Sequence, residues 1–156
     1  MPPAIRPGRR ADARAAADLY LRARAAALSA GSIPPGIHDD DDVRGYFAAH
    51  IVEDCELWLA EEDGVLAGIL VLDGDMIDQL YVEPGRTGRG IGSALLAVAK
   101  RERPEGLRLW TFQSNAGAQR FYERHGFVAV RRTDGRSNEE RAPDVLYACG
   151  GAQAPS

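Results

Sequence analysis

The sequence predicts an α/β fold whose elements follow the order βααβββαβαββ. Short apolar runs bounded by turn residues indicate the strands, and apolar side chains that recur every three or four residues indicate the helices. Gly, Pro and Asp-Gly steps separate these segments. With 156 residues and 45% hydrophobic content, residues 1–149 fit a single domain, and the small polar residues 150–156 predict a disordered tail.

The N-terminal part predicts a strand followed by a helix. Residues 4–6 form a short apolar strand, and Asp12 is expected to cap a helix that runs to about residue 28. Leu19 and Ala23 lie on the apolar face of this helix. Residues 29–37 contain two glycines and a Pro-Pro step, which predicts a loop.

A run of four aspartates, residues 39–42, introduces the second predicted helix. Val43, Tyr46 and His50 follow it at helical spacing. Acidic residues at a helix start complement the helix dipole, which explains the run without a ligand. A metal site formed by His38 and these aspartates is the alternative interpretation.

The remaining elements are read from turn residues and apolar runs. The Asp-Gly step within residues 62–64 predicts a hairpin, and Gly74 with Asp75 predicts a second turn. A helix rich in Ala and Leu begins near Ser93 and ends before Pro104. The predicted strands are 56–61, 65–72, 76–82, 107–112, 127–130 and 145–149, and the last predicted helix is 115–125.

Composition excludes several classes of protein. A formal charge of −4 and a pI near 5.4 argue against a nucleic-acid-binding surface. No apolar run approaches the roughly 18 residues of a membrane span, and the N-terminus lacks the apolar core of a signal peptide, so we expect a cytoplasmic protein without a membrane partner. Cys55 and Cys149 have no metal or redox spacing and are expected to be packing residues in a reduced compartment.

The most informative segment is a glycine-dense loop that opens onto a helix. Glycines at positions 88, 90 and 92 leave the backbone N–H groups accessible to a ligand. The helix that follows from Ser93 presents unpaired N–H groups and a partial positive charge at its N-terminus. This combination predicts a phosphate-binding site.

Two common phosphate motifs do not fit this loop. A nucleoside triphosphate loop requires GxxxxGK[ST], and no Lys-Ser or Lys-Thr step follows a glycine here. A dinucleotide fingerprint requires GxGxxG, but counting from Gly88 reaches Ser93, and counting from Gly90 reaches Leu95.

Residues 87–92, Thr-Gly-Arg-Gly-Ile-Gly, resemble the pyrophosphate-binding Q/R-x-x-G-x-G/A motif of the GNAT superfamily of acyl-CoA-dependent N-acyltransferases. Residues 115–127 resemble that family's second signature, N-x-x-A-x-x-F-Y-E-x-x-G-F. The order and separation of the two segments also agree. The resemblance implies a GNAT-type fold, a mixed central sheet flanked by helices, with acetyl-CoA as co-substrate and no metal. Thr87 departs from the usual Gln or Arg, although its hydroxyl can still bond a phosphate oxygen.

The resemblance also implies where acetyl-CoA binds. Two neighbouring parallel strands, 76–82 and 107–112, are expected to splay apart around the thioester. Arg86 and Arg89 flank the loop and either meet the phosphates or lie on plain solvated surface. The residues expected to bind acetyl-CoA are Leu80, Tyr81, Val82, Thr87, Gly88, Arg89, Gly90, Ile91, Gly92, Ser93 and Asn115. Asn115 is also placed to cap its helix.

Two residues are candidates for proton transfer. Tyr122 lies about two helical turns after Asn115 and is expected to protonate the departing thiolate, with a packed core tyrosine as the alternative. Family members carry a glutamate base at positions that correspond here to Met76 or Trp110, so neither assignment transfers. Asp78 is the nearest carboxylate and is expected to activate the amine through water, with a solvated or salt-bridged aspartate as the alternative.

The predicted function is N-acetyl transfer from acetyl-CoA to a primary amine of a small molecule or peptide by direct attack. The alternative is a non-catalytic domain that senses acetyl-CoA. Homodimers are common in this family, so a homodimer is a candidate assembly. The acceptor is expected to meet a mildly acidic and aromatic wall that contains Tyr20, Tyr46, Glu139, Glu140 and Asp144.

Overall fold

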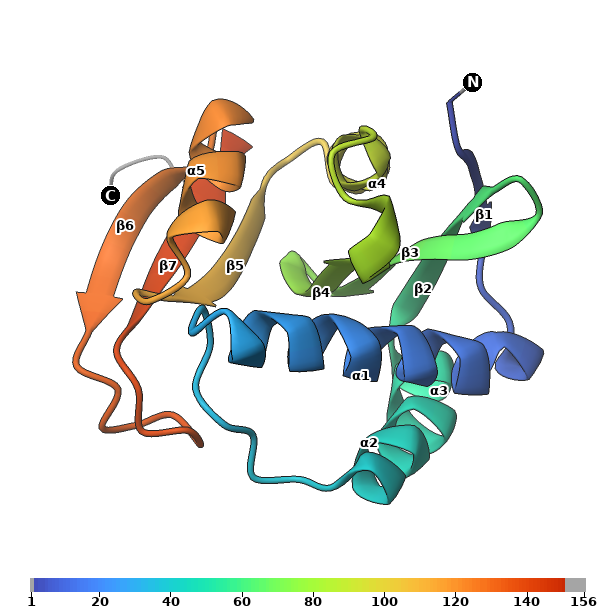
Figure 1. Cartoon of the computed structure of the whole chain (residues 1–156). Coiled ribbons are helices and arrows are strands. Elements are labelled where there is room, and N and C mark those ends of the chain that lie inside the picture. The colour runs from blue at the N-terminus through green and yellow to red at the C-terminus, as the bar shows by residue number, and fades with distance from the viewer. Residues whose placement is uncertain (1, 151–156) are drawn as a thin grey trace.

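In the computed structural model, which describes residues 2–150, seven strands form one sheet in the order β1-β2-β3-β4-β5-β7-β6 (Figure 1). The strands are β1 (Ala4–Pro7), β2 (Glu56–Glu62), β3 (Val65–Asp73), β4 (Met76–Val82), β5 (Leu107–Phe112), β6 (Val128–Thr133) and β7 (Asp144–Cys149). The helices are α1 (Ala13–Ser29), α2 (Asp40–Tyr46), α3 (Val52–Asp54), α4 (Ile91–Glu102) and α5 (Ala116–Arg124). Of the predicted disordered tail, all residues after Gly150 lie outside the described part.

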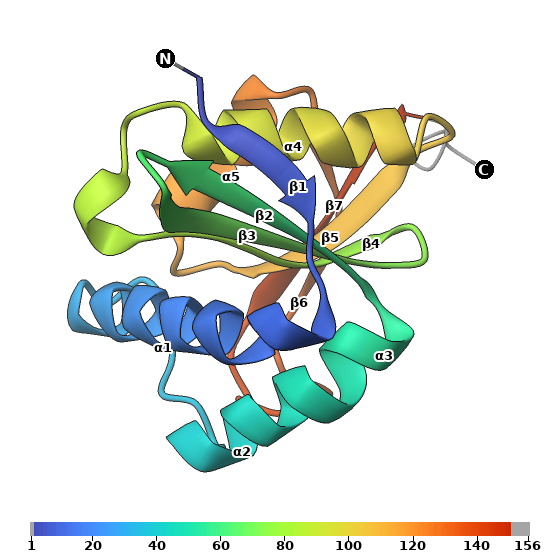
Figure 2. The ribbon, with the colours of Figure 1, turned by 90° about the vertical axis from the view of Figure 1, so that its right-hand side faces the viewer.

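Helices cover both faces of the sheet. α4 and α5 lie on one face, and α1, α2 and α3 lie on the other (Figure 2). This arrangement confirms the predicted fold class and element order. The second predicted helix differs in detail, because the π-helix Phe47–Ile51 separates α2 from α3. No helix within residues 2–150 is long and apolar enough to cross a bilayer.

Strand β3 joins the two halves of the core because it is buried on both faces. Leu70 packs with Leu95 of α4 in one apolar cluster, and Ile69 packs with Leu19 of α1 in the other. All four side chains are 0% exposed. Successive side chains of a strand point to opposite faces, so the unbroken apolar run of β3 contributes alternate residues to the two clusters.

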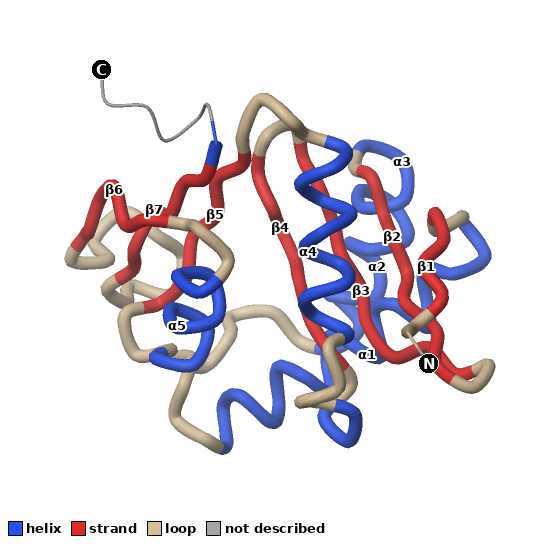
Figure 3. Tube along the Cα trace, turned by 90° about the horizontal axis from the view of Figure 1, so that it is seen from above, coloured by secondary structure: helices blue, strands red, loops and turns tan. Residues whose placement is uncertain are grey.

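Strands β4 and β5 are parallel but pair at one position only within residues 2–150, Met76 with Arg108. The Arg108 Nε atom also lies 2.9 Å from Asp75 Oδ2, which ties the strands together at this end. Beyond that pair they diverge toward their C-terminal ends (Figure 3). We call this separation the β4–β5 fork. It leaves the β4 backbone groups on that edge without a strand partner.

A β-bulge lies in β4 at Asp78. Val71 of β3 pairs with Gln79, while the next residue, Leu72, pairs with Ile77. Asp78 is therefore the extra residue, opposite no residue of β3. A bulge bends its strand and re-aims a side chain, and bulges are common beside active sites.

Asp12 is the N-cap residue of α1, as predicted, but its side chain does not make the expected capping hydrogen bond. Its carboxylate accepts hydrogen bonds from the Arg6 guanidinium at 2.9 Å and from the Arg9 backbone N–H at 2.8 Å. No side-chain bond from Asp12 reaches the first turn of α1. The Arg6 guanidinium holds the pKa of Asp12 below its ordinary range. The carboxylate thus ties β1 to the start of the helix.

The aspartate run at 39–42 begins α2, as the helix-dipole interpretation predicts. Asp39 Oδ1 accepts a hydrogen bond from the Asp42 N–H at 2.8 Å. The His38 ring lies 3.3 Å from Glu139 instead of meeting the aspartates. Within residues 2–150 the run and His38 therefore form no shared cluster of metal-ligating atoms.

Candidate active site

The glycine loop places open space in front of the N-terminus of α4. Gly88 and Gly90 both have left-handed backbones, with φ of 77° and 82°, and Gly90 is the N-cap residue. The first α-helical bond runs from the Ala94 N–H to the Gly90 carbonyl at 3.0 Å, so the preceding amides of the first turn have no intrahelical acceptor. A Cβ at Gly88 or Gly90 would meet no heavy atom within 4 Å. The left-handed backbone at Gly88 and Gly90 favours glycine, and the empty space in front of both residues would admit a ligand.

The two arginines that flank the loop are held by one carboxylate. Arg86 Nη1 lies 2.6 Å from Glu62 Oε1, and Arg89 Nη1 lies 2.9 Å from the same atom. These contacts, the Arg86 hydrogen bond first, lower the pKa of Glu62. One carboxylate of strand β2 therefore engages both cationic side chains and offsets one of their two positive charges.

The side chain of Ser93 is also engaged. Its hydroxyl lies 3.1 Å from His125 Nε2, at the end of α5. Burial first, and then the positive charges of Lys100 and Arg124, lower the pKa of His125. A neutral imidazole at this position links α4 to α5 without adding charge beside the loop.

A small groove of about 180 Å³ lies between β4, the start of α4 and α5. It is lined by Leu80, Val82, Gly92, Ala118, Phe121 and Tyr122. The groove therefore brings together four of the predicted site residues, which come from three separate elements. A Cβ on Gly92 would stand 3.4 Å from the Phe121 ring, so only a small side chain fits there.

Tyr122 presents its ring to this groove and is 8% exposed. The ring packs edge-on against Phe121 at 5.1 Å and Phe127 at 5.5 Å. Its hydroxyl makes no hydrogen bond to another residue of the range 2–150, and because no fully buried side-chain N or O atom there lacks a partner, the oxygen keeps some exposure. The Tyr147 hydroxyl, in contrast, donates to Glu123 at 2.7 Å. Burial raises the pKa of Tyr122, so the phenol keeps its proton at neutral pH.

Asn115 caps α5, as its position predicts. Its Oδ1 accepts a hydrogen bond from the Ala118 N–H at 3.1 Å. The cap uses only the carbonyl side of the amide. The Nδ2 group makes no hydrogen bond to another described residue and is able to donate to a ligand at the end of β5.

A larger pocket of about 660 Å³ lies on the opposite face of β4, among α1, α2 and the loop between β6 and β7. Tyr20, Tyr46, Glu139 and Glu140, four of the predicted acceptor-wall residues, line it. Tyr81 forms part of its floor, with its ring edge-on to Tyr20 at 5.1 Å. Because side chains alternate along β4, this strand contributes Tyr81 to this pocket and its neighbours Leu80 and Val82 to the small groove.

Asp144 does not belong to this wall. Its carboxylate is buried and accepts hydrogen bonds from Thr133 and from Asn138 Nδ2, which fix the loop between β6 and β7. It contributes instead to a broader cavity of about 740 Å³ beside Trp110. The prediction for Asp144 is wrong because it followed loop charge alone.

Asp78 projects from the β-bulge into the larger pocket. The Gln79 side chain makes only a long contact of 3.5 Å to it. The Asp78 side chain keeps an exposed surface, but the partial loss of water around its carboxylate raises the pKa of Asp78, and the charge of Asp73 adds to the effect. Asp78 forms no salt bridge with another residue of the range 2–150, so its carboxylate is able to accept a proton from a bound amine or water.

Sequence reasoning missed several residues of the larger pocket. His38, Arg24 and Gln79 line it from a loop, a helix and a strand that are far apart in the chain. Arg24 lies over the Tyr20 ring at 5.8 Å and donates to the His38 carbonyl at 3.1 Å. No local pattern marks such residues, because only the packing of α1 against the loop brings them together.

Residues 53–129 match the model of a family described as an acetyltransferase (GNAT) domain. The peptidyl-lysine N-acetyltransferase YiaC of Escherichia coli K12 is 37% identical over 74 residues, which cover 47% of this chain and 50% of that protein. The chain spans between 32% and 54% of the lengths of four curated relatives that align with it.

Solved structures are similar over nearly the whole chain. The apo form of YjaB from Escherichia coli aligns with a TM-score of 0.74 at 21% identity, covering 95% of this chain and 97% of that chain. The structure of yncA from Salmonella typhimurium, which was solved with its cofactor acetyl-CoA, aligns with a TM-score of 0.68 at 21% identity, covering 100% and 98%. At these identities the likeness establishes the fold.

Proposed function

Because the chain belongs to the GNAT superfamily of acyl-CoA-dependent N-acyltransferases, we propose that it transfers an acetyl group from acetyl-CoA to a primary amine of a small molecule or peptide. The observation that carries this proposal is the β4–β5 fork, which opens between the amide-rich start of α4 and the unpartnered hydroxyl of Tyr122. Acetyl-CoA bound to the related yncA supports the choice of co-substrate.

The pyrophosphate of acetyl-CoA is proposed to bind the backbone amides of residues 88–93. That position is favoured by the dipole of α4 and by the space in front of Gly88 and Gly90. Thr87 and Arg89 adjoin the loop, and Arg89 has to share its charge with Glu62. The pantetheine arm would then follow the open edge of β4 at residues 80–82, with the Asn115 amide as a further donor.

Acetyl transfer is proposed to occur by direct attack. The amine nitrogen attacks the thioester carbonyl carbon from the larger pocket, and a β4 amide stabilises the carbonyl oxygen as charge develops. The C–S bond breaks, and the thiolate takes its proton from the Tyr122 hydroxyl. The nitrogen loses its proton to Asp78, directly or through water, because Asp78 is the carboxylate of β4 that lines this pocket.

The acceptor is proposed to be a primary amine that approaches as a cation and releases its ammonium proton to solvent, after which the neutral nitrogen attacks and passes its second proton to Asp78. Asp78, Glu139 and Glu140 surround the pocket with negative charge, and Tyr20 and Tyr46 add aromatic surface. The similarity to a peptidyl-lysine N-acetyltransferase favours a lysine side chain of a peptide among such amines. The open pocket has room for a side chain of that length.

The direct test is incubation of the full chain with acetyl-CoA and a panel of amines, with detection of free CoA thiol and of the acetylated product by mass spectrometry. We expect thiol release that depends on a cationic primary amine. Acetyl-CoA binding by calorimetry without thiol release from any amine would favour the sensor alternative, for which the absence of a family glutamate at Met76 and Trp110 is the supporting observation.

A further inference from the structure

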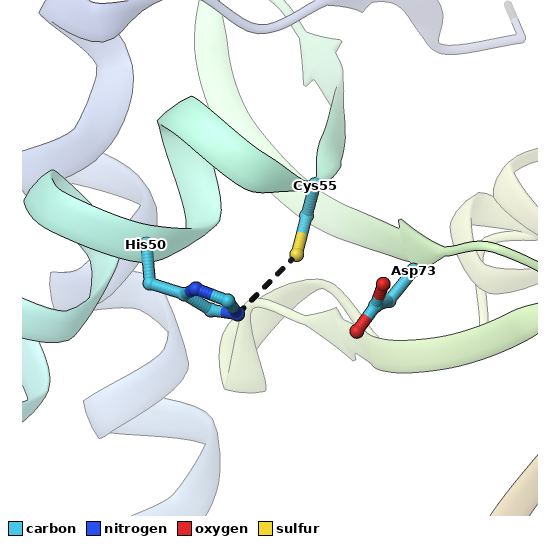
Figure 4. Close-up of side chains that lie close together, drawn as sticks. All are labelled: His50, Cys55 and Asp73. Carbon is cyan, nitrogen blue, oxygen red and sulfur yellow. Dashed lines mark hydrogen bonds between the residues drawn. The ribbon is translucent and has the colours of Figure 1, made fainter.

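A cluster of metal-ligating side chains lies outside the acetyl-CoA site. His50 comes from the π-helix, Cys55 from the segment between α3 and β2, and Asp73 from the end of β3 (Figure 4). One ligand atom from each residue lies within 4.8 Å of the others. The His50 Nε2 atom is 3.8 Å from the Cys55 sulfur. Within residues 2–150, no other group of three or more metal-ligating side chains lies this close together.

A second contact orients the histidine toward the cluster. His50 Nδ1 lies 3.0 Å from Asp54 Oδ2, so the carboxylate fixes the ring and leaves Nε2 directed at Cys55. Histidines that bind metals almost always have their other ring nitrogen held by a carboxylate, a carbonyl or water. His50 therefore has both the outer partner and the open nitrogen of a metal ligand.

The distances suit a tetrahedral ion. Zinc binds thiolate sulfur at about 2.3 Å and imidazole nitrogen at about 2.0 Å, which places the two ligand atoms about 3.6 Å apart. The separation of His50 Nε2 and Cys55 Sγ, 3.8 Å, is close to that value. Asp73 is exposed at the end of its strand, so its carboxylate is able to rotate from a separation of up to 4.8 Å to the roughly 3.5 Å that tetrahedral zinc requires.

We propose that His50 Nε2, Cys55 Sγ and the Asp73 carboxylate bind one zinc ion, with the fourth position open to water. A thiolate and an imidazole select zinc over the hard cations magnesium and calcium, which prefer oxygen ligands. Binding deprotonates the Cys55 thiol and releases that proton to solvent. The site adds a metal to a protein for which the sequence predicts none.

The proposed zinc site adjoins the acceptor pocket. Tyr46, which lines that pocket, packs against the His50 ring with centroids 4.9 Å apart. Zinc would join the stretch from the π-helix to β2, which contains His50 and Cys55, to the end of β3. Binding to the folded state alone stabilises it, so zinc is expected to raise the Tm and to fix one wall of the pocket.

The test uses the full chain after reduction and removal of metal by a chelator. After dialysis against zinc, we expect one zinc per chain by elemental analysis, an exothermic or endothermic one-site calorimetric titration, and a higher Tm. Cobalt in place of zinc should give a thiolate-to-cobalt charge-transfer band in the unmutated protein. These measurements require no acetyl-CoA and no amine, so their outcome is independent of acetyl transfer.

Matched variants locate the site. Cys55→Ser and His50→Asn should lose the zinc and the cobalt band, while Cys149→Ser and His38→Asn should keep both. Asp54→Asn should weaken zinc binding by about 10- to 100-fold, as expected when an outer partner of a ligand is lost. Absence of retained zinc and of the cobalt band in the unmutated chain, or equal zinc in Cys55→Ser and Cys149→Ser, overturns the proposal.

Discussion

Met76 of β4 and Arg108 of β5 form the single pair at which these parallel strands register within residues 2–150. Within the described residues no later residue of β4 pairs with β5, although β4 continues to Val82 and β5 to Phe112. The ion pair of Asp75 with Arg108 holds the closed end. The open end therefore presents an unpaired strand edge beside the start of α4 and Tyr122, where the pantetheine arm is proposed to lie.

A large side chain at Gly90 should abolish acetyl-CoA binding. Leu at this position would occupy the open space in front of the α4 amides. It would also adopt a left-handed backbone, at a cost of about 1–2 kcal/mol in stability. Calorimetry with acetyl-CoA and denaturant unfolding of Gly90→Leu measure the two effects separately.

Gly64→Leu is the matched control for Gly90→Leu. Gly64 lies in the turn between β2 and β3, has a φ of 75°, and has no heavy atom within 4 Å of a Cβ position. It should show the same loss of stability with unchanged acetyl-CoA affinity. Equal affinities for the Gly90 and Gly64 variants would rule out the loop as the pyrophosphate site.

The pH dependence of acetyl transfer should report Asp78. Burial raises the pKa of this carboxyl, and a base acts only when it is deprotonated. Activity should therefore fall as the pH is lowered through a pKa above that of an ordinary aspartate. Asp78→Asn should lower kcat/KM by about 10²-fold and remove this acidic limb of the profile.

Asp63→Asn is a suitable control for Asp78→Asn, because Asp63 lies in a surface turn with a φ of 55°, which asparagine tolerates. Its pH profile should match that of the unmodified protein. An acidic limb that persists unchanged in Asp78→Asn would show that another group, or the substrate itself, titrates there.

The charge of the acceptor pocket should affect cationic amines selectively. Glu139→Gln together with Glu140→Gln removes two negative charges from its rim. KM for a cationic amine should rise about 5-fold, equivalent to a surface charge pair of about 1 kcal/mol, and the effect should shrink at high salt. Glu105→Gln, in the exposed loop after α4, is the control. A KM that does not change for lysine peptides would contradict an acidic acceptor site.

Local sequence patterns predicted the glycine turn before α4 and the cap of α5 well. The glycines at 88 and 90 mark a turn into a helix, and Asn115 occupies a cap position that its side chain indeed fills. Each of these features depends on a few adjacent residues. The order of elements was likewise predictable because it rests on apolar spacing within single segments.

Features that depend on register or on distant segments were not predictable. The bulge that aims Asp78 into the pocket arises from the offset between β3 and β4. Glu62 of β2 forms ion pairs with Arg86 and Arg89, and the Asp12 side chain pairs with Arg6 of β1 instead of bonding to its helix. Glu62 and Asp12 each pair with a residue of another element, and local propensity contains no information on strand offset or on such partners.

Removal of the proposed proton donor, the Tyr122 hydroxyl, is the most direct test of acetyl transfer at the β4–β5 fork. Tyr122→Phe keeps the ring that packs on Phe121 and Phe127 and removes only the hydroxyl. Tyr147→Phe is the control, because its hydroxyl bonds Glu123 away from the groove. Kcat at saturating acetyl-CoA and the Kd for CoA are measured for both variants.

If Tyr122 protonates the departing thiolate, Tyr122→Phe lowers kcat by roughly 10²-fold with an unchanged Kd for CoA, while Tyr147→Phe keeps kcat. An unmodified kcat in Tyr122→Phe would contradict transfer beside this residue and would make the tyrosine a packing side chain.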